Sequence, residues 1–221
     1  MRGLVFLGPA GAGKGTQAKL LCNATGWEHI STGDMLREEC KKDTPFSEKL
    51  RNTLVAGDLA EDVDMIELLR QRLKYMNGRG FILDGFPRTF VQAEMLKSVE
   101  FTLAKVVYFK LGLEGMKTRL LGRLTCFDCG STYHDFYSSP KKESECDDCG
   151  GKLVKRPDDT LEVIEERYKI FKKHTKPLVE YYGDRVLKID ARDYPEDIAN
   201  VIRGHMGNGT EVKSSATDIS A

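Results

Sequence analysis

A lysine at the end of a glycine-rich loop offers the clearest chemistry in the sequence. Gly8 and Gly13 have four residues between them and are followed at once by Lys14, which is the P-loop spacing. Glycines allow backbone N–H groups to surround an anion, and the lysine adds a full positive charge. Gly15 stands where Ser or Thr is usual, and Thr16 comes one position later. The loop predicts a binding site for a nucleoside phosphate.

An acidic residue follows a second apolar run. Asp84 ends the run that begins at Phe81, and Gly85 comes directly after it. A carboxylate at the carboxyl end of a buried parallel strand lies where α/β sheets bind their ligands. Beside a P-loop, such a group can hold Mg²⁺ directly or through water. A strand-end cap is the alternative, but the upstream loop favours a role in orienting magnesium.

Four of the six cysteines have the spacing of a metal site. Cys126 and Cys129 form one CxxC pair, Cys146 and Cys149 form a second, and sixteen residues separate the pairs. Four thiolates complete the tetrahedral shell of a structural Zn²⁺ and leave no open position. A redox dithiol or disulfides are the alternatives, but two matched pairs favour a metal. The other two cysteines are expected to be packing residues.

Two arginines lie on a helix predicted from Glu114 to Arg123. Arg119 and Arg123 are four positions apart and are therefore expected on one helix face. Such arginines most often belong to a solvated surface. Because this helix follows directly on a predicted strand, we expect both side chains to face bound phosphates.

Composition and charge narrow the class of protein. The 34 basic and 34 acidic residues cancel, so no overall field draws the chain to nucleic acid or to a membrane. No apolar run is long enough to span a bilayer, and no basic-then-apolar signal segment precedes the first predicted strand. We expect a cytoplasmic protein with reduced thiols and with neither nucleic acid nor membrane as a partner.

The elements that must position these residues alternate between strand and helix. Such alternation predicts an α/β fold, a three-layer sandwich with a parallel sheet covered by helices on both faces. Its five strands are predicted near Leu4, Glu28, Phe81, Val106 and Val186. Further helices are expected at Ser47–Ala56, from Asp62, from Thr160 with a break at Pro177, and from Pro195.

Two segments interrupt the alternation. Residues 31–60 are predicted to form a helical arm, and residues 122–159 a cysteine insert of β type. The tail at 207–221 has no hydrophobic period and predicts disorder. The remaining residues, 1–30, 61–121 and 160–206, are expected to form the core.

Taken together, the motifs resemble the adenylate kinase family in its long form, whose lid carries zinc. The resemblance runs from Met1 to about His205, and the order of the motifs makes it specific. The stretches that carry it are Gly8–Thr16, Ser31–Arg37, Asp84–Thr89 with Gln92, Arg119–Arg123, Arg156–Asp159 and Arg167. It implies reversible transfer of a phosphoryl group from Mg-ATP to AMP, giving two ADP, with residues 31–60 as the AMP-binding arm and residues 122–159 as the lid.

The resemblance also implies roles for single residues. Residues expected to bind ATP are Gly11, Ala12, Gly13, Lys14, Gly15, Thr16, Arg119, Arg123, Thr132 and Tyr133. Residues expected to bind AMP are Thr32, Arg37, Asp58, Leu59, Ala60, Gly85, Arg88, Gln92, Arg156 and Arg167. The residues expected to act in catalysis are Lys14, Asp84, Arg88, Arg123, Arg156 and Arg167, with Asp84 orienting Mg²⁺ through water. Structural Zn²⁺ would bind the four cysteines.

Phosphoryl transfer depends on positioning and charge neutralisation more than on acid–base groups, which suits this set of cations. The resemblance favours AMP as acceptor, because Thr32 is the residue of the AMP-specific members, whereas relatives that phosphorylate UMP and CMP have Ala there. The amide of Gln92 can pair with the adenine edge. The expected small-molecule partners are ATP, AMP and ADP, and the protein is expected to act as a monomer.

Two other functions stay open at this point. A kinase for another nucleotide pair, such as GTP with AMP, would resemble this chain in its core, although such members usually lack the cysteines. A zinc-ribbon module that recognises nucleic acid or protein, with a degenerate P-loop, is the second. The acidic stretch Glu143–Asp148 argues against a phosphate backbone as its partner.

Overall fold

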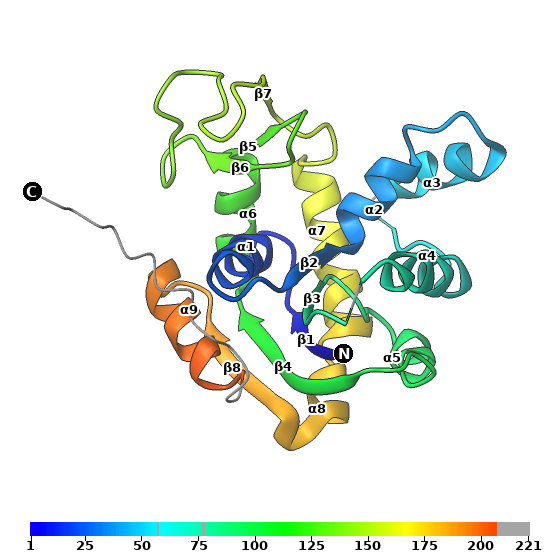
Figure 1. The fold of residues 1–221 in the computed structure, drawn as a ribbon. Helices are drawn as coiled ribbons and strands as arrows, with labels where there is room; N and C mark the ends of the chain where they lie inside the picture. The colour runs from blue at the N-terminus through cyan, green and yellow to red at the C-terminus, as the bar shows by residue number, and fades with distance from the viewer. Residues whose placement is uncertain (57, 77, 207–221) are drawn as a thin grey trace, which may run out of the picture.

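The computed structural model describes residues 1–56, 58–76 and 78–206 of the chain. A five-stranded, all-parallel sheet forms the middle layer, with helices on both of its faces (Figure 1). In spatial order its strands are β2 (Glu28–Ser31), β3 (Phe81–Asp84), β1 (Arg2–Leu7), β4 (Thr102–Lys110) and β8 (Val186–Asp190). The predicted fold class and its five strands are confirmed.

Strand β1 shows why the sheet has two apolar faces. Leu4 and Phe6 are fully buried in one cluster, whereas Val5 and Leu7 are buried in the other, as the period of two along a strand requires. Burial of each such side chain contributes about 1.5–3 kcal/mol. The first cluster includes residues of α1 (Lys14–Thr25) and α9 (Pro195–Gly204). The second includes residues of α4 (Asp62–Lys74), α5 (Phe90–Leu96) and α8 (Leu178–Tyr182).

The helical arm contains two helices, α2 (Thr32–Glu39) and α3 (Pro45–Ala56). Ser31 caps α2, because its hydroxyl accepts a hydrogen bond from the backbone N–H of Asp34 at 3.2 Å. Asp62 is the first residue of α4, as expected, and Glu61 is the N-cap of this helix. The Asp62 carboxylate accepts hydrogen bonds from the side chains of Thr89 and Gln92.

The cysteine insert follows helix α6 (Leu113–Leu121) and forms an antiparallel sheet. Its strands, in the order β6–β5–β7, are Thr132–His134, Arg123–Cys126 and Leu153–Val154. The expected helix from 114 to 123 is therefore wrong at its end, since Arg123 begins β5 and pairs with His134. Gly122 permits this turn, because a Cβ there would meet the His134 ring at 2.4 Å.

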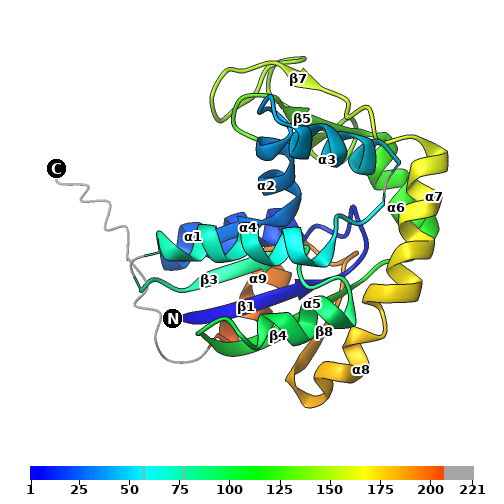
Figure 2. The ribbon, with the colours of Figure 1, turned by 90° about the vertical axis from the view of Figure 1, so that its right-hand side faces the viewer.

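A helical segment returns the chain from the insert to the core. Helix α7 (Leu161–Ile170) is capped by Thr160 and passes into a π-helical turn, Phe171–Thr175. Pro177 then precedes α8, so the predicted break is confirmed, and a short 3₁₀ turn, Gly183–Arg185, leads to β8. Figure 2 shows α7 along the side of the molecule, with the insert above α2 and α3.

Within the residues described, no helix has the length and apolar character that crossing a membrane would require. The segment expected to be a disordered tail, 207–221, lies outside the described residues.

Candidate active site

The glycine-rich loop connects β1 to α1 at the carboxyl edge of the sheet. Gly11 and Gly13 have φ of +72° and +82°, a left-handed backbone that glycine adopts at little cost. Lys14 is the first residue of α1 and is half-buried. Its Nζ donates hydrogen bonds to the carbonyls of Gly8 at 3.0 Å and Pro9 at 2.8 Å. The ammonium group therefore lies across the loop that it follows.

Asp84 supplies the opposite charge beside Lys14. The Nε2 atom of His29 lies 3.3 Å from Oδ2 of Asp84. Burial opposes ionisation of Asp84, but the hydrogen bond from His29 and the charge of Lys14 hold its pKa below the usual value. Burial also lowers the pKa of Lys14 to about 8, although the charge of Asp84 opposes that shift. Both groups are charged at neutral pH.

Gly15, which stands where the generic loop pattern has Ser or Thr, lies beside Asp84. A Cβ at this position would lie 3.4 Å from Oδ2 of Asp84. The longer side chain of Ser or Thr would reach toward the carboxylate. Glycine therefore keeps the space in front of Asp84 open, which suits a hydrated divalent cation on that carboxylate.

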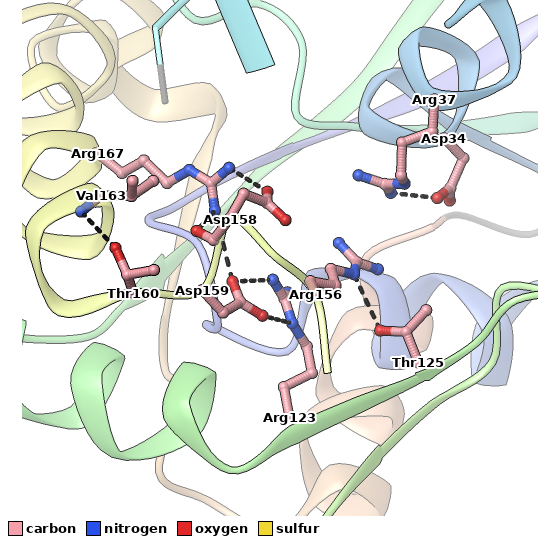
Figure 3. Close-up of polar contacts among 10 residues, drawn as sticks. All are labelled: Asp34, Arg37, Arg123, Thr125, Arg156, Asp158, Asp159, Thr160, Val163 and Arg167. Atoms are coloured by element: carbon pink, nitrogen blue, oxygen red, sulfur yellow. Dashed lines mark hydrogen bonds and ion pairs between the residues drawn. The ribbon is translucent and has the colours of Figure 1, made fainter. Parts of the chain in front are cut away.

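Arginines from several elements line the same cleft as Lys14 and Asp84. Figure 3 shows Arg37 from α2, Arg123 from β5, Arg156 from the segment between β7 and α7, and Arg167 from α7. The return of the chain from the insert brings Arg156 and Arg167 close to Arg123, which lies at the start of the insert.

Two adjacent aspartates hold two of these arginines. Asp159, whose side chain is only 4% exposed, accepts hydrogen bonds from Nε of Arg123 at 2.8 Å and from its Nη2 at 2.6 Å. Arg167 pairs with Asp158 and lies 3.5 Å from Asp159 (Figure 3). Bidentate contacts of this kind fix the plane of a guanidinium group. The aspartates therefore set the direction in which Arg123 and Arg167 point.

Arg156 and Arg88 carry charge that the local carboxylates do not balance. Nε of Arg156 donates to the hydroxyl of Thr125 at 2.9 Å, a neutral partner. Burial lowers the pKa of Arg156 to about 9, and the charges of Arg123 and Arg37 add to the shift. Burial likewise lowers the pKa of Arg88. An anion bound among these groups would stabilise their charged forms.

Three hydrogen bonds hold Arg88, which lies in the segment after β3. Nε of Arg88 donates to the carbonyl of Gly85 at 2.8 Å. Its backbone N–H donates to Oε1 of Gln92 at 2.8 Å, and its carbonyl accepts from the hydroxyl of Thr175 at 3.0 Å. Thr175 belongs to the π-helical turn, so that turn connects the return segment to Arg88.

Thr32 and Gln92, predicted to bind AMP, are both buried. The Thr32 hydroxyl lies 3.2 Å from the carbonyl of Asp84 and donates to that of Gly85 at 3.0 Å. Gln92 is 2% exposed, and both ends of its amide have protein partners, as Nε2 donates to Oδ1 of Asp62 at 2.8 Å. Arg37, also predicted for AMP, pairs with a neighbouring aspartate, Asp34.

On the side predicted for ATP, Arg119 of α6 spans two loops. It donates to the carbonyl of Gly11 at 3.3 Å and to that of Ala191 at 2.5 Å. The hydroxyl of Tyr133, another predicted ATP contact, accepts from the backbone N–H of Asp147 at 2.8 Å. That hydroxyl is thus engaged within the insert.

A single cleft of about 2500 Å³ runs past the glycine-rich loop, Asp84 and the arginines. Pockets for one small molecule are commonly about 300–1,000 Å³, so this cleft has room for two. Every residue predicted from the sequence to bind nucleotide or to act in catalysis lines it. The structure therefore brings these residues together, while their individual roles stay predictions.

The four cysteines of the insert also meet. Their sulfur atoms lie within 4.8 Å of one another, and the pairs Cys126–Cys149 and Cys129–Cys146 are each separated by 3.5 Å. All six cysteines of the chain are free thiols. Sulfur atoms bound to one Zn²⁺ at about 2.3 Å would lie about 3.8 Å apart. The arrangement fits a tetrahedral metal that prefers thiolates.

The insert contacts both the core and the helical arm. Nζ of Lys19, on α1, donates to the hydroxyl of Ser131 at 2.8 Å. Nζ of Lys41, after α2, lies 5.3 Å from the centre of the Phe127 ring in a cation–π contact. Phe127 lies within the first CxxC pair, so the metal-type cluster faces the arm.

Reasoning from the sequence missed the residues that orient the predicted ones. His29, Asp62, Asp159 and Thr175 each bond a predicted site residue or its backbone. The one available signal was the run Arg156–Asp159, where two carboxylates follow an arginine and precede another on the next helix.

Comparison with known proteins gives one consistent result. The chain matches the family model described as adenylate kinase over residues 6–187. It is 42% identical over 203 residues to the adenylate kinase of Archaeoglobus fulgidus, covering 90% of this chain and 93% of that protein. It is also 42% identical over 193 residues to the adenylate kinase of Caldicellulosiruptor saccharolyticus, with 85% and 90% covered. The adenylate kinase of Treponema denticola is 40% identical over 197 residues, with 88% and 94% covered.

Proposed function

The chain belongs to the adenylate kinase family, and on that premise we propose how it transfers a phosphoryl group from ATP to AMP to give two ADP. The observation that carries the proposal is the single cleft, in which Lys14 and the arginine cluster surround one space with room for two nucleotides. A transfer between two bound nucleotides needs such a shared, cationic cleft.

The chemistry asks for charge neutralisation at the transferred group. In phosphoryl transfer, negative charge is spread over the phosphoryl oxygens, and the protein acts mainly by positioning and electrostatic stabilisation. Lys14, Arg88, Arg123, Arg156 and Arg167 supply cations for this purpose. A planar guanidinium can grip phosphate oxygens in two places, and partners such as Asp159 orient it before substrate binds.

The donor nucleotide is assigned to the P-loop side of the cleft. Backbone N–H groups of Gly11–Thr16 and the ammonium of Lys14 would hold its phosphates. Arg119, Thr132 and Tyr133 would contact the rest of ATP. When bound with ATP, Mg²⁺ neutralises charge on the phosphates, and Asp84 would hold it through water.

The acceptor nucleotide is assigned to the side that faces the helical arm. The groups assigned to AMP come from α2, from the segment between α3 and α4, and from the chain after β3 as far as α5. They are Thr32, Arg37, Asp58, Leu59, Ala60, Gly85, Arg88 and Gln92. Arg156 and Arg167 would contact the phosphates of both nucleotides. The acceptor oxygen then faces the donor's terminal phosphate inside the cleft.

Two segments are proposed to close over the bound nucleotides, namely the AMP arm at 31–60 and the lid at 122–159. The core to which both are attached consists of residues 1–30, 61–121 and 160–206. Two contacts support closure of the lid onto the other parts. Lys19 of the core bonds Ser131 of the lid, and Lys41 of the arm contacts Phe127 of the lid. Closure excludes water, which would otherwise take the phosphoryl group from ATP.

The four cysteines are proposed to hold a structural Zn²⁺. The sulfur spacing supports this assignment, and the absence of a free position on a four-thiolate metal leaves no role for it in the transfer. Free thiols are also typical of a reducing compartment, which supports a cytoplasmic enzyme. The protein is proposed to act as a monomer, since the cleft contains all the assigned groups within one chain.

The choice of nucleotides is tested by measuring product formation from each donor and acceptor pair with Mg²⁺. ATP with AMP is expected to give the highest kcat/KM, and GTP as donor or UMP as acceptor is expected to be poorer by about 10²-fold or more, as sites built on base-specific hydrogen bonds discriminate strongly. Faster turnover with GTP as donor, or with UMP as acceptor, would overturn the assignment.

A further inference from the structure

We propose that Asp62 determines specificity for adenine in the acceptor site, by fixing which way round the side-chain amide of Gln92 is held. The inference rests on the proposed function, because it takes Gln92 to be the residue that reads the base of AMP. Asp62 would not touch the nucleotide. It would act through Gln92 as a positioning residue.

The side chain of Gln92 is held by two groups of fixed hydrogen-bonding character. Oε1 of Gln92 accepts from the backbone N–H of Arg88 at 2.8 Å, and Nε2 donates to Oδ1 of Asp62 at 2.8 Å. A backbone N–H can only donate, and an ionised carboxylate can only accept. Rotation of the amide by 180° would face donor to donor at Arg88 and acceptor to acceptor at Asp62.

Asp62 is itself held in place. The same Oδ1 atom accepts from the hydroxyl of Thr89 at 3.1 Å, and that hydroxyl accepts from the backbone N–H of Gln92 at 3.1 Å. Thr89 is the cap of α5, so the carboxylate, the cap and the amide form one network at the start of this helix. Asp62 opens α4, so the network joins two helices.

Burial makes the orientation of the amide costly to change. Gln92 is only 2% exposed, yet it lines the cleft. Water has little access to replace a lost partner, and an unpaired buried polar group costs about 1–3 kcal/mol. One amide hydrogen and one lone pair of the Gln92 side chain remain for a ligand after its two protein partners are counted.

A fixed amide distinguishes the purine bases. Adenine carries an amino donor at position 6, whereas guanine and hypoxanthine carry a carbonyl acceptor there. An amide carbonyl held toward that position accepts from adenine but opposes the acceptor of the other two bases. A glutamine free to rotate could present its NH₂ group instead and accept either class. The carboxylate of Asp62 thus converts an ambiguous side chain into an adenine reader.

The test compares Asp62→Ala with two matched variants in assays with AMP, GMP and IMP as acceptors. Asp62→Ala is expected to raise KM for AMP by roughly ten-fold, the effect of one charge-assisted hydrogen bond, with little change in kcat. The preference for AMP over IMP and GMP should fall by a similar factor. Asp62→Asn keeps a carbonyl acceptor and is expected to restore most of the preference.

Asp64→Ala is the second matched variant. It removes a carboxylate from the same first turn of α4 without touching Gln92, so it reports any general effect on the helix. Its AMP preference should equal that of the wild type. An Asp62→Ala enzyme whose AMP preference matches that of Asp64→Ala overturns the proposal.

Gln92→Leu separates failure of this inference from failure of the proposed function. If Gln92→Leu leaves KM for AMP unchanged, the assignment of Gln92 to the AMP site fails. If Gln92→Leu raises that KM, then Asp62→Ala should add nothing in the Gln92→Leu background, because Asp62 acts only through the amide. Additive effects of the two substitutions would overturn the role of Asp62 and leave that of Gln92 intact.

Discussion

At the scale of single residues, the cleft holds cations under conditions that disfavour their charge. Lys14 and Arg156 have pKa values lowered to about 8 and about 9, in each case mainly by burial. The negative charges of neighbouring carboxylates raise these two pKa values, but by less than burial lowers them. Bound phosphates would stabilise the charged forms of both residues, so their charge state and nucleotide binding are coupled.

The pH dependence of ATP binding follows from Lys14. Its charged form binds phosphate, so a bound nucleotide raises its pKa above the value of about 8 in the free enzyme. Affinity is therefore insensitive to Lys14 below pH 8 and falls as pH rises above it, by up to about ten-fold at pH 9. The measurement is the Kd of ATP between pH 7 and pH 9.5.

Lys14→Arg is the matched control for this dependence. Arginine has an intrinsic pKa about two units or more above that of lysine, so the variant is expected to bind ATP more weakly and to show a flatter profile between pH 8 and pH 9 than the wild type. Parallel profiles for the wild type and Lys14→Arg would show that another group is responsible.

The sequence could predict which residues come together where the signal is local. The P-loop and the CxxC pairs each lie within a few residues, and the structure brings the members of each set together. The partner of Arg123 was not predictable in the same way, since Asp159 lies 36 residues away and reaches it only through the return of the insert. Likewise, nothing local indicates that Asp62 would bond Gln92, 30 residues later.

At the scale of elements, the insert has very little apolar core. Its buried hydrophobic cluster consists of Cys126, Cys146 and Leu153, with only Leu124 and Tyr133 packed against it. Two of these three buried residues are candidate metal ligands. So small a core cannot hold three short strands together, and a bound metal would supply the missing free energy.

Removal of the metal is therefore expected to loosen the insert first. Chelation should lower Tm by roughly 5 °C or more and should direct limited proteolysis to residues 122–159. The checks are thermal unfolding, mapped proteolysis and metal content. Cys149→Ser should reduce bound zinc, whereas Cys40→Ser, outside the cluster, should not. Unchanged Tm and protease resistance after chelation would contradict a structural role for zinc.

Element boundaries were the weaker part of the sequence analysis. The spacing of Arg119 and Arg123 suggested one continuous helix, but the chain turns at Gly122 so that β5 can pair with β6. Helical periodicity cannot reveal where a helix gives way to a strand whose partner lies further along the chain. Helix α5 has only seven residues, too short for a clear period, and was not identified.

At the scale of the whole molecule, the charged groups of the site meet at one edge of the parallel sheet. The P-loop, Asp84 and the segment holding Arg88 all follow strands β1 and β3, which are neighbours in the sheet. The helical arm and the insert bring Arg37, Arg123 and Arg156 to the same cleft, and Figure 3 shows these side chains. The alternation of strands and helices was enough to predict this sheet, because it depends on pattern and not on any single contact.

The central claim is that Lys14 serves phosphoryl transfer in a cleft shared by ATP and AMP, and a single variant tests it most directly. ADP formation from ATP and AMP with Mg²⁺ is measured for Lys14→Met beside the wild type, together with zinc content and Tm. The claim predicts that kcat/KM falls by at least about 10²-fold, as for loss of one preorganised charge at a reacting phosphate, with zinc and fold retained. Turnover close to that of the wild type, in a folded variant that keeps its zinc, would contradict it.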